Sequence, residues 1–187
     1  LVQSARPATQ FIVPTVPYLL PQVRQLAAAS GLGNAVHVIE GQSHAALAAC
    51  DLTLIASGTA TLEAALFHKP MVIAYAMPAL SYHLMWRKRQ LPWVGLPNIL
   101  CAPRTWLHRP ADVPARVWAD KPDAPFVVPE LVQHAATPAA LAAAVLGWLD
   151  APETMAATTA RFEQLHAELR RPTAQLASDA IQTLLDR

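Results

Sequence analysis

The stretch from residue 52 to residue 75, LTLIASGTATLEAALFHKPMVIAY, constrains the fold of this chain more than any other. It holds two apolar runs, 52–56 and 71–75, on either side of a Gly-containing turn and a helical stretch from Ala60 to Phe67. Apolar runs without polar alternation are typical of strands that are buried on both faces. The order strand, turn, helix, strand therefore predicts one βαβ unit of a parallel sheet.

The same alternation continues along the rest of the chain. We expect further strands at 9–13, ended by Pro14, and at 36–39, and helices at 18–30, 43–50 and 78–90. Three more helices are expected at 137–149, 153–170 and 173–185, whereas the proline-rich segment 101–126 predicts a long irregular loop. The fold class is therefore α/β, a Rossmann-like parallel sheet with helices on both faces that ends in helices.

Composition and charge narrow the classes of function. The formal net charge is +1 and only 14% of the residues are charged, which argues against nucleic acid as a partner. Cys50 and Cys101 lack the spacing of a disulfide framework or a zinc site, the seven histidines show no metal-ligand spacing, and a reducing cytoplasm fits best. A hydrophobic fraction of 53% predicts an extensive buried interface or a membrane-proximal face, and no apolar run is long enough to span a bilayer. Because the sequence starts at Leu1 without a signal-peptide pattern, we expect a segment of a longer protein.

The turn after the 52–56 run is the candidate ligand site. Open α/β sheets bind ligands at the carboxyl ends of their strands, and Gly58 lets the backbone approach a ligand closely. The N–H groups at the start of the following helix, from Ala60 to Leu62, form an anion site that suits a diphosphate. Three hydroxyls add donors around it, those of Ser57, Thr59 and Thr61. The plainer alternative is a capped helix whose hydroxyls are satisfied internally.

Glu63 lies one turn into the same helix. A capping box would need Ser or Thr three residues earlier, and that residue is Ala60. A carboxylate at this position can instead accept hydrogen bonds from a ribose diol, as acidic residues do in dinucleotide folds. The nucleophile elbow of serine hydrolases is not matched, because Ile55 stands two residues before Ser57.

The segments ASGTATLEAALFHKPMVIAY and YHLMWRKRQLPWVGLPNIL, together with the VPELVQ block, resemble the lipid-A-disaccharide synthase family. Members of that family have two Rossmann-like domains in the GT-B arrangement. They transfer 2,3-diacylglucosamine from its UDP donor to an acylated glucosamine 1-phosphate, lipid X, and release UDP. The resemblance implies that residues 1–150 form the UDP-sugar donor-binding domain, with a long loop at 101–126, and that 151–187 pack back toward an absent N-terminal domain.

Carried over residue by residue, the resemblance also implies a donor site. The residues expected to meet UDP are Ser57, Gly58, Thr59, Ala60, Thr61 and Glu63. Asn98 would face the cleft near the donor, and Glu130 and Gln133 would lie near that cleft. No catalytic residue, metal or cofactor is expected in this chain, since the family's general base belongs to the other half. Its arginine-bearing loop belongs before Leu1, and the 101–126 segment is longer than the family's usual connection.

The resemblance further implies a peripheral contact with the cytoplasmic face of the bacterial inner membrane. The cluster Trp86, Arg87, Lys88 and Arg89, with apolar neighbours, suits an anionic lipid surface, although a solvated helix end would look similar. Three alternatives stay open at this point: another UDP-sugar GT-B transferase, a UDP-GlcNAc epimerase-like enzyme, and a non-catalytic nucleotide-binding or interaction domain. A homodimer also stays open.

Overall fold

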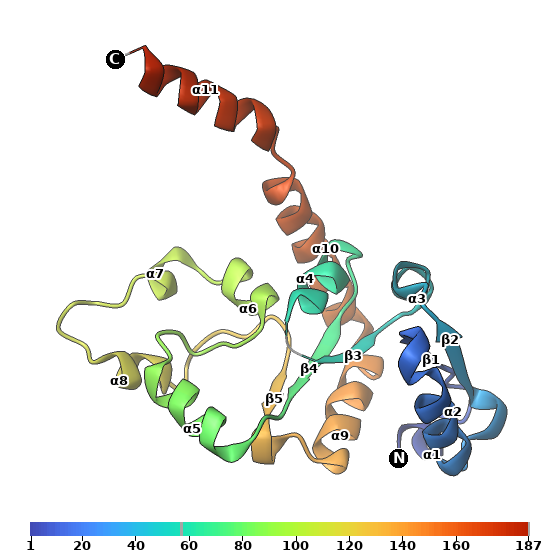
Figure 1. Cartoon of the computed structure of the whole chain (residues 1–187). Coiled ribbons are helices and arrows are strands. Elements are labelled where there is room, and N and C mark those ends of the chain that lie inside the picture. The colour runs from blue at the N-terminus through green and yellow to red at the C-terminus, as the bar shows by residue number, and fades with distance from the viewer. Residues whose placement is uncertain (57, 187) are drawn as a thin grey trace.

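The strands form two parallel sheets in the computed structural model, which describes residues 1–56 and 58–186 (Figure 1). One sheet pairs β1 (Phe11–Thr15) with β2 (Val36–Glu40). The other has the order β3-β4-β5, from strands β3 (Thr53–Ala56), β4 (Met71–Tyr75) and β5 (Glu130–Val132). Helices flank both sheets, which confirms the α/β class with a parallel arrangement.

Helices connect the strands, and the chain after β5 is helical. Before β4 lie α1 (Val2–Ala5), α2 (Leu20–Ala29), α3 (Ser43–Ala49) and α4 (Thr59–Leu66), with 3-10 turns η1 (Pro17–Leu19) and η2 (Gly33–Ala35). Between β4 and β5 lie α5 (Ala79–Lys88), α6 (Leu96–Cys101), α7 (Arg104–Leu107) and α8 (Ala115–Ala119). After β5 come η3 (Gln133–Ala135), α9 (Pro138–Leu149), α10 (Pro152–Leu169) and α11 (Thr173–Leu185).

The core is centred on β4. Met71, Val72 and Ile73 have no exposed surface, as expected for the middle strand of a sheet that is covered by helices. The α4 helix packs on β3 with the small residues Ala64 and Ala65, which are also fully buried. These apolar contacts fix the β3–α4–β4 unit, so the turn between β3 and α4 is presented by a rigid support.

Two expectations from the sequence need correction. β1 does not stop at Pro14 but runs on to Thr15. Because Thr15 bonds to Gly41 on the β2 side, Pro14 faces the other edge of β1, where its missing N–H breaks no bond of the β1–β2 ladder. The 101–126 segment is not irregular throughout, since it contains α7 and α8. Its local core is a set of indole rings: Trp106 lies 6.0 Å from Trp93 and 5.1 Å from Trp118 between ring centroids.

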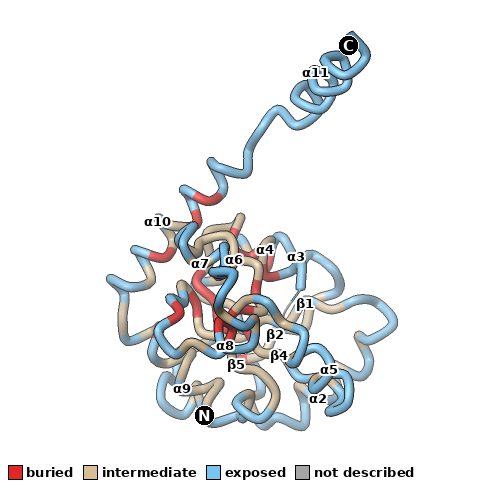
Figure 2. The backbone as a smooth tube through the Cα atoms, turned by 90° about the vertical axis from the view of Figure 1, so that its left-hand side faces the viewer, coloured by how far each residue is buried: buried red, intermediate tan, exposed pale blue. Residues whose placement is uncertain are grey.

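The two last helices differ sharply in their packing. The α10 helix packs on α4 and α9, and its Phe162 and Leu165 are buried in the core. The α11 helix projects away from the body and is exposed along its whole length (Figure 2). Its exposed aliphatic side chains are Leu176, Ile181, Leu184 and Leu185. In the described part of the chain, no helix is long and apolar enough to span a bilayer.

Candidate functional site

The turn between β3 and α4 is built around Gly58. This glycine has φ +136° and ψ −162°, a conformation that residues with a side chain rarely adopt, and it directly precedes the helix. Nothing lies within 4 Å of the place where a Cβ would stand, so its surface is open. Thr59 and Ala60 form the first turn of α4 and are exposed. The helix terminus therefore presents its first amides to the space at the carboxyl end of β3.

Thr61 does not add a donor to this site. Its side chain has no exposed surface, and its hydroxyl donates to the Gly58 carbonyl oxygen at 2.7 Å. Its backbone N–H donates to the same oxygen at 3.2 Å. Of the amides expected to form an anion site, that of Thr61 is therefore engaged within the turn, whereas Thr59 and Ala60 lie in the exposed first turn of α4. Ser57, also expected here, lies outside the described residues.

Glu63 faces outward on the same side of α4 as Thr59. Residues four apart lie one above the other on a helix, so the carboxylate stands one turn below the exposed terminus. Its Oε2 lies 3.9 Å from Nε2 of His44, and half of its side chain is exposed. His44 comes from α3, which follows β2, and its ring packs against that of Phe67 at 5.4 Å. The sequence did not single out His44, although its place just inside a helix that follows a strand was a signal for it.

Asn98 lies inside the protein rather than facing a cleft. It is fully buried at the start of α6, where its Oδ1 accepts from the backbone N–H groups of Val127 and Val128 at 2.8 and 3.0 Å. Its Nδ2 donates to the Val128 carbonyl at 2.9 Å and to Glu130 at 2.8 Å. Both polar atoms of the Asn98 side chain are therefore hydrogen-bonded within the protein. These bonds join α6 to the segment before β5.

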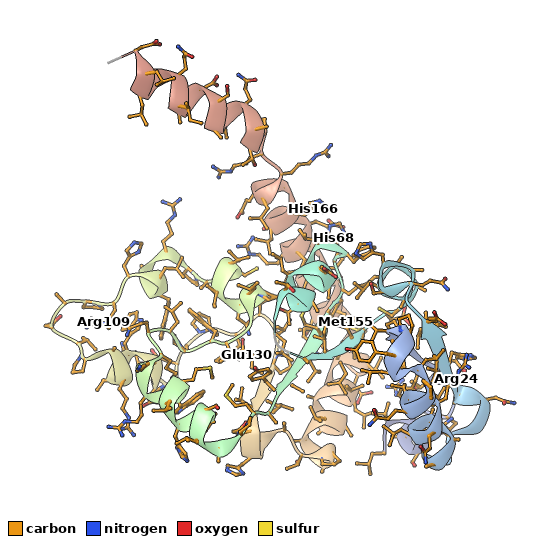
Figure 3. The ribbon with its side chains drawn as sticks, viewed as in Figure 1. Arg24, His68, Arg109, Glu130, Met155 and His166 are labelled. Carbon is orange, nitrogen blue, oxygen red and sulfur yellow. The ribbon has the colours of Figure 1, made fainter. Side chains whose placement is uncertain are left out.

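Glu130 is a half-buried carboxylate held by three donors. Besides Asn98, the backbone amides of Val94 and Gly95 donate to it at 2.8 and 2.9 Å. Burial raises the pKa of Glu130, and these hydrogen bonds oppose that rise. A Cβ at Gly95 would press on Ile73 Cδ1 and lie 2.9 Å from Glu130 Oε1, so both side chains would have to shift to admit another residue. Figure 3 places Glu130 in the interior between the α5–α8 region and the sheet, where it closes the turn that leads into α6.

Gln133 clamps the loop after β4 to the end of β5. Its Oε1 accepts from the Met77 N–H at 2.8 Å, and its Nε2 donates to the Met77 carbonyl at 2.7 Å. Gln133 itself has φ +53°, which turns the chain into η3. The clamp lies at the carboxyl ends of β4 and β5, at the edge of the sheet that open α/β folds use for ligands. Gln133 therefore shapes that edge and has its own amide groups satisfied.

The cluster expected to touch a membrane is divided in the structure. Arg87 and Lys88 are exposed at the end of α5. The Arg89 guanidinium, in contrast, stacks on Trp86 at 3.2 Å from the ring centroid, pairs with Asp120 and donates to the Ala119 carbonyl. Only 12% of the Arg89 side chain is exposed, so this cation serves to fasten α5 to α8.

A surface hollow lies away from the turn. It measures about 360 Å³ and is lined in part by Asp51, Lys69, Met155 and Thr159. His68 also lines it, and its Nε2 lies 3.1 Å from Nδ1 of His166 in α10. Figure 3 labels both histidines near the junction of α4 and α10. Because Asp51 and Lys69 precede β3 and β4, the hollow opens at the amino ends of the strands. Ligands of open α/β sheets bind at the opposite ends, so we place the candidate site at the β3–α4 turn.

The comparisons with known proteins identify the family of this chain. The family model for lipid-A-disaccharide synthetase matches residues 1–106, a span that includes β1 to β4 and the β3–α4 turn. The chain belongs to the lipid-A-disaccharide synthetase family. It is 51% identical over 189 residues to the lipid-A-disaccharide synthase of Verminephrobacter eiseniae, and 51% identical to that of Albidiferax ferrireducens. A third relative, from Thiobacillus denitrificans, is 45% identical over 177 residues.

The chain is shorter than these family members. The alignments cover 99% of this chain with the first two relatives and 91% with the third. They cover only 43% or 42% of the relatives themselves. The family is thus established for this chain, which spans less than half the length of the relatives that it matches.

Proposed function

We propose that this chain is the donor-binding part of a glycosyltransferase of lipid A biosynthesis. The whole enzyme would transfer 2,3-diacylglucosamine from its UDP donor to the acylated glucosamine 1-phosphate lipid X, with release of UDP. The observation that carries the proposal is the exposed N-terminus of α4. Thr59 and Ala60 are exposed there, and nothing lies within 4 Å of the place where a Cβ of Gly58 would stand. Family membership supports this reaction. Because the chain spans only 43% of the length of its relative, the acceptor-binding residues would belong to the remaining part of the enzyme.

The diphosphate of the donor would lie against the start of α4. The first amides of a helix and the helix dipole favour negative charge at this terminus, and the Thr59 hydroxyl would add a donor. The same groups would stabilise the charge that develops on UDP as it leaves. Ser57 would contribute on this proposal, whereas Thr61 holds the turn from inside.

Glu63 would bind the ribose of the nucleotide. Its carboxylate stands on the exposed side of α4, one turn from the diphosphate position, and can accept two hydrogen bonds from a diol. His44 approaches from α3 and would limit the side-chain conformations of Glu63. The acceptor hydroxyl would be deprotonated by a residue of the absent half, as the resemblance to the family implies.

Glu63→Gln in the complete enzyme tests this assignment. Loss of hydrogen bonds to a charged acceptor costs about 1.5–3 kcal/mol, so the donor KM should rise roughly ten- to a hundredfold with a smaller change in kcat. Glu153→Gln is the control, because Glu153 is an exposed acid in the first turn of α10, far along the chain from the site. A Glu63→Gln enzyme with the donor KM of the parent would remove Glu63 from the site.

The exposed face of α5 would contact the anionic membrane surface that supplies the acylated substrates. Leu80 and Leu84 are 74% and 55% exposed, and Arg87 and Lys88 continue the same face. Trp86 and Arg89 would support this face from behind instead of touching lipid. The double variant Arg87→Ser/Lys88→Ser should lose about 2 kcal/mol of binding to phosphatidylglycerol vesicles. Arg24→Ser on α2 is the control, and equal sedimentation of all three proteins would exclude this face.

The exposed α11 helix would pack on the absent half of the enzyme. Its aliphatic side chains are 51% to 75% exposed, which is costly for a helix that stays in solvent. Leu184→Ser should therefore lower the melting temperature of the complete enzyme and leave that of the 187-residue chain unchanged. Equal melting shifts in both proteins would argue against this contact.

A further inference from the structure

The loop between β4 and α5 lies beside the candidate site. β3 and β4 are parallel neighbours, and the last pair of their ladder joins Ala56 to Ala74. Neighbouring strands run roughly 4.8 Å apart, so the β3–α4 turn and the loop 76–78 leave the sheet side by side. Ala76 and Pro78 of this loop are exposed. A ligand at the start of α4 that extends toward β4 therefore meets this loop.

The two sides of the β3–α4 turn suit different parts of a sugar nucleotide. On one side His44 of α3 approaches Glu63, the residue proposed to bind the ribose. The α3 helix packs on β1, a strand of the other sheet, so this side faces away from β4. A diphosphate that starts from a ribose on the α3 side ends on the β4 side. The sugar is bonded to that end, which directs it toward the loop 76–78.

Gln133 fixes this loop from the end of the neighbouring strand. Its Oε1 accepts from the Met77 N–H at 2.8 Å and its Nε2 donates to the Met77 carbonyl at 2.7 Å, so two bonds hold one residue of the loop. We infer that Gln133 is a positioning residue for the transferred sugar: it keeps the loop 76–78 in the place where the sugar binds, without touching the sugar. The inference rests on the proposed function, because it requires a sugar nucleotide at the β3–α4 turn.

The backbone of Gln133 shows that the side chain is what this position needs. Its φ of +53° lies in the left-handed region, which glycine adopts without strain and other residues adopt rarely. A glycine would make the same turn into η3 more easily, but it would leave both Met77 groups without these partners. Strained residues of this kind cluster at functional sites. The strain at Gln133 accompanies a contact that acts on the edge of the sheet where ligands bind.

The contact acts on the loop and not on the sheet. Main-chain pairing of β4 with β5 already extends to Tyr75 and Val132, and the buried residues of β4 lie before that point. Gln133 follows this ladder directly and reaches Met77, two residues before α5 begins at Ala79. Figure 1 shows the start of α5 beside the end of β5. Loss of the contact should therefore shift the loop and the start of α5 while the sheet stays in place.

Gln133→Met in the complete enzyme tests the inference. Methionine has a similar length but makes neither bond to Met77, so kcat for sugar transfer should fall roughly ten- to a hundredfold, as expected when a reacting group is displaced by about 1 Å. The dissociation constant of UDP, measured by calorimetry on the same enzyme, should not change, because UDP carries no sugar. A purely structural role of Gln133 would weaken both. Gln25→Met is the control, since Gln25 is exposed on α2.

Two results would overturn the inference. One is a kcat of Gln133→Met equal to that of the parent enzyme, and the other is a loss of UDP affinity as large as the loss in kcat. Should Gln133→Met fail to fold, Gln133→Glu keeps the bond from the Met77 N–H and loses only the donation to the Met77 carbonyl, and the same two measurements decide. The proposed function has a separate test, because a Glu63→Gln enzyme with the donor KM of the parent contradicts it whatever Gln133 does.

Discussion

Substituting Asn98 by aspartate changes one buried group without changing its shape. Oδ1 would keep its two contacts with the Val127 and Val128 amides. The atom that replaces Nδ2 would be an oxygen 2.8 Å from the Glu130 carboxylate and 2.9 Å from the Val128 carbonyl. Two carboxylates at this separation cannot both be ionised, so the folded variant must take up a proton that the two groups share.

The size of the effect follows from that proton. While the pair holds this one proton, it can serve only one acceptor, so the Val128 carbonyl loses its partner at a cost of about 1–3 kcal/mol. The folded variant also binds a proton that the unfolded chain releases above pH 4, so its stability falls with rising pH by up to about 1.4 kcal/mol per pH unit. Between pH 5 and pH 8 the additional loss reaches about 4 kcal/mol on the same basis.

Urea unfolding of Asn98→Asp and the parent protein at pH 5 and pH 8 measures both parts. In the parent protein burial raises the pKa of Glu130, so its own contribution to stability is largest at low pH and falls as the pH rises through that pKa. The parent therefore gives the reference slope of unfolding free energy against pH. Asn98→Ala removes the contacts without adding an acid, so its slope should be less steep than that of Asn98→Asp. A loss in Asn98→Asp that is the same at both pH values would refute the shared proton and the buried position of Asn98.

Two further predictions concern packing. Gly95→Ala should destabilise the protein by about 1–3 kcal/mol and lower its melting temperature, because the added methyl meets Ile73 and lies 2.9 Å from Glu130. Gly147→Ala is the control: nothing lies within 4 Å of the added methyl in α9, so this variant should be about 0.5–1 kcal/mol more stable than the parent. Melting-temperature shifts of the same sign and size in both variants would count against the close packing at Gly95. Trp148→Phe removes the 3.1 Å bond from the indole N–H to the Met71 carbonyl and should cost about 1–3 kcal/mol in urea unfolding. An unchanged midpoint for Trp148→Phe would mean that this bond does not anchor α9.

The β3–α4–β4 unit could be predicted closely from the sequence. The second strand was expected at 71–75 and forms there, and the helix begins at Thr59, one residue before the expected start. Local signals suffice here, because the apolar runs are uninterrupted and a glycine marks the turn. The 101–126 segment was less predictable, since α7 and α8 are stabilised by contacts among tryptophans that are distant in sequence.

The orientation of individual polar side chains was the weakest part of the prediction. Thr61 and Asn98 were expected to face a ligand and instead point inward, where each satisfies backbone groups. Sequence spacing gives the face of a helix for a periodic pattern, but an isolated hydroxyl or amide in a short helix carries no such period. The place of His44 at the start of a helix could be predicted, but its proximity to Glu63 could not, because it depends on how α3 and α4 lie after separate strands.

The bond between Gln133 and Met77 lets a side chain stand in for a peptide group. A glutamine amide offers one acceptor and one donor with the geometry of a backbone unit, so the β4–β5 ladder gains a rung without another strand residue. The main chain is then free to turn at once into η3, while the start of α5 stays fixed to the sheet. Asparagine is one methylene too short for this role, and glutamate lacks the donor, so tolerance to substitution at this position should be unusually narrow.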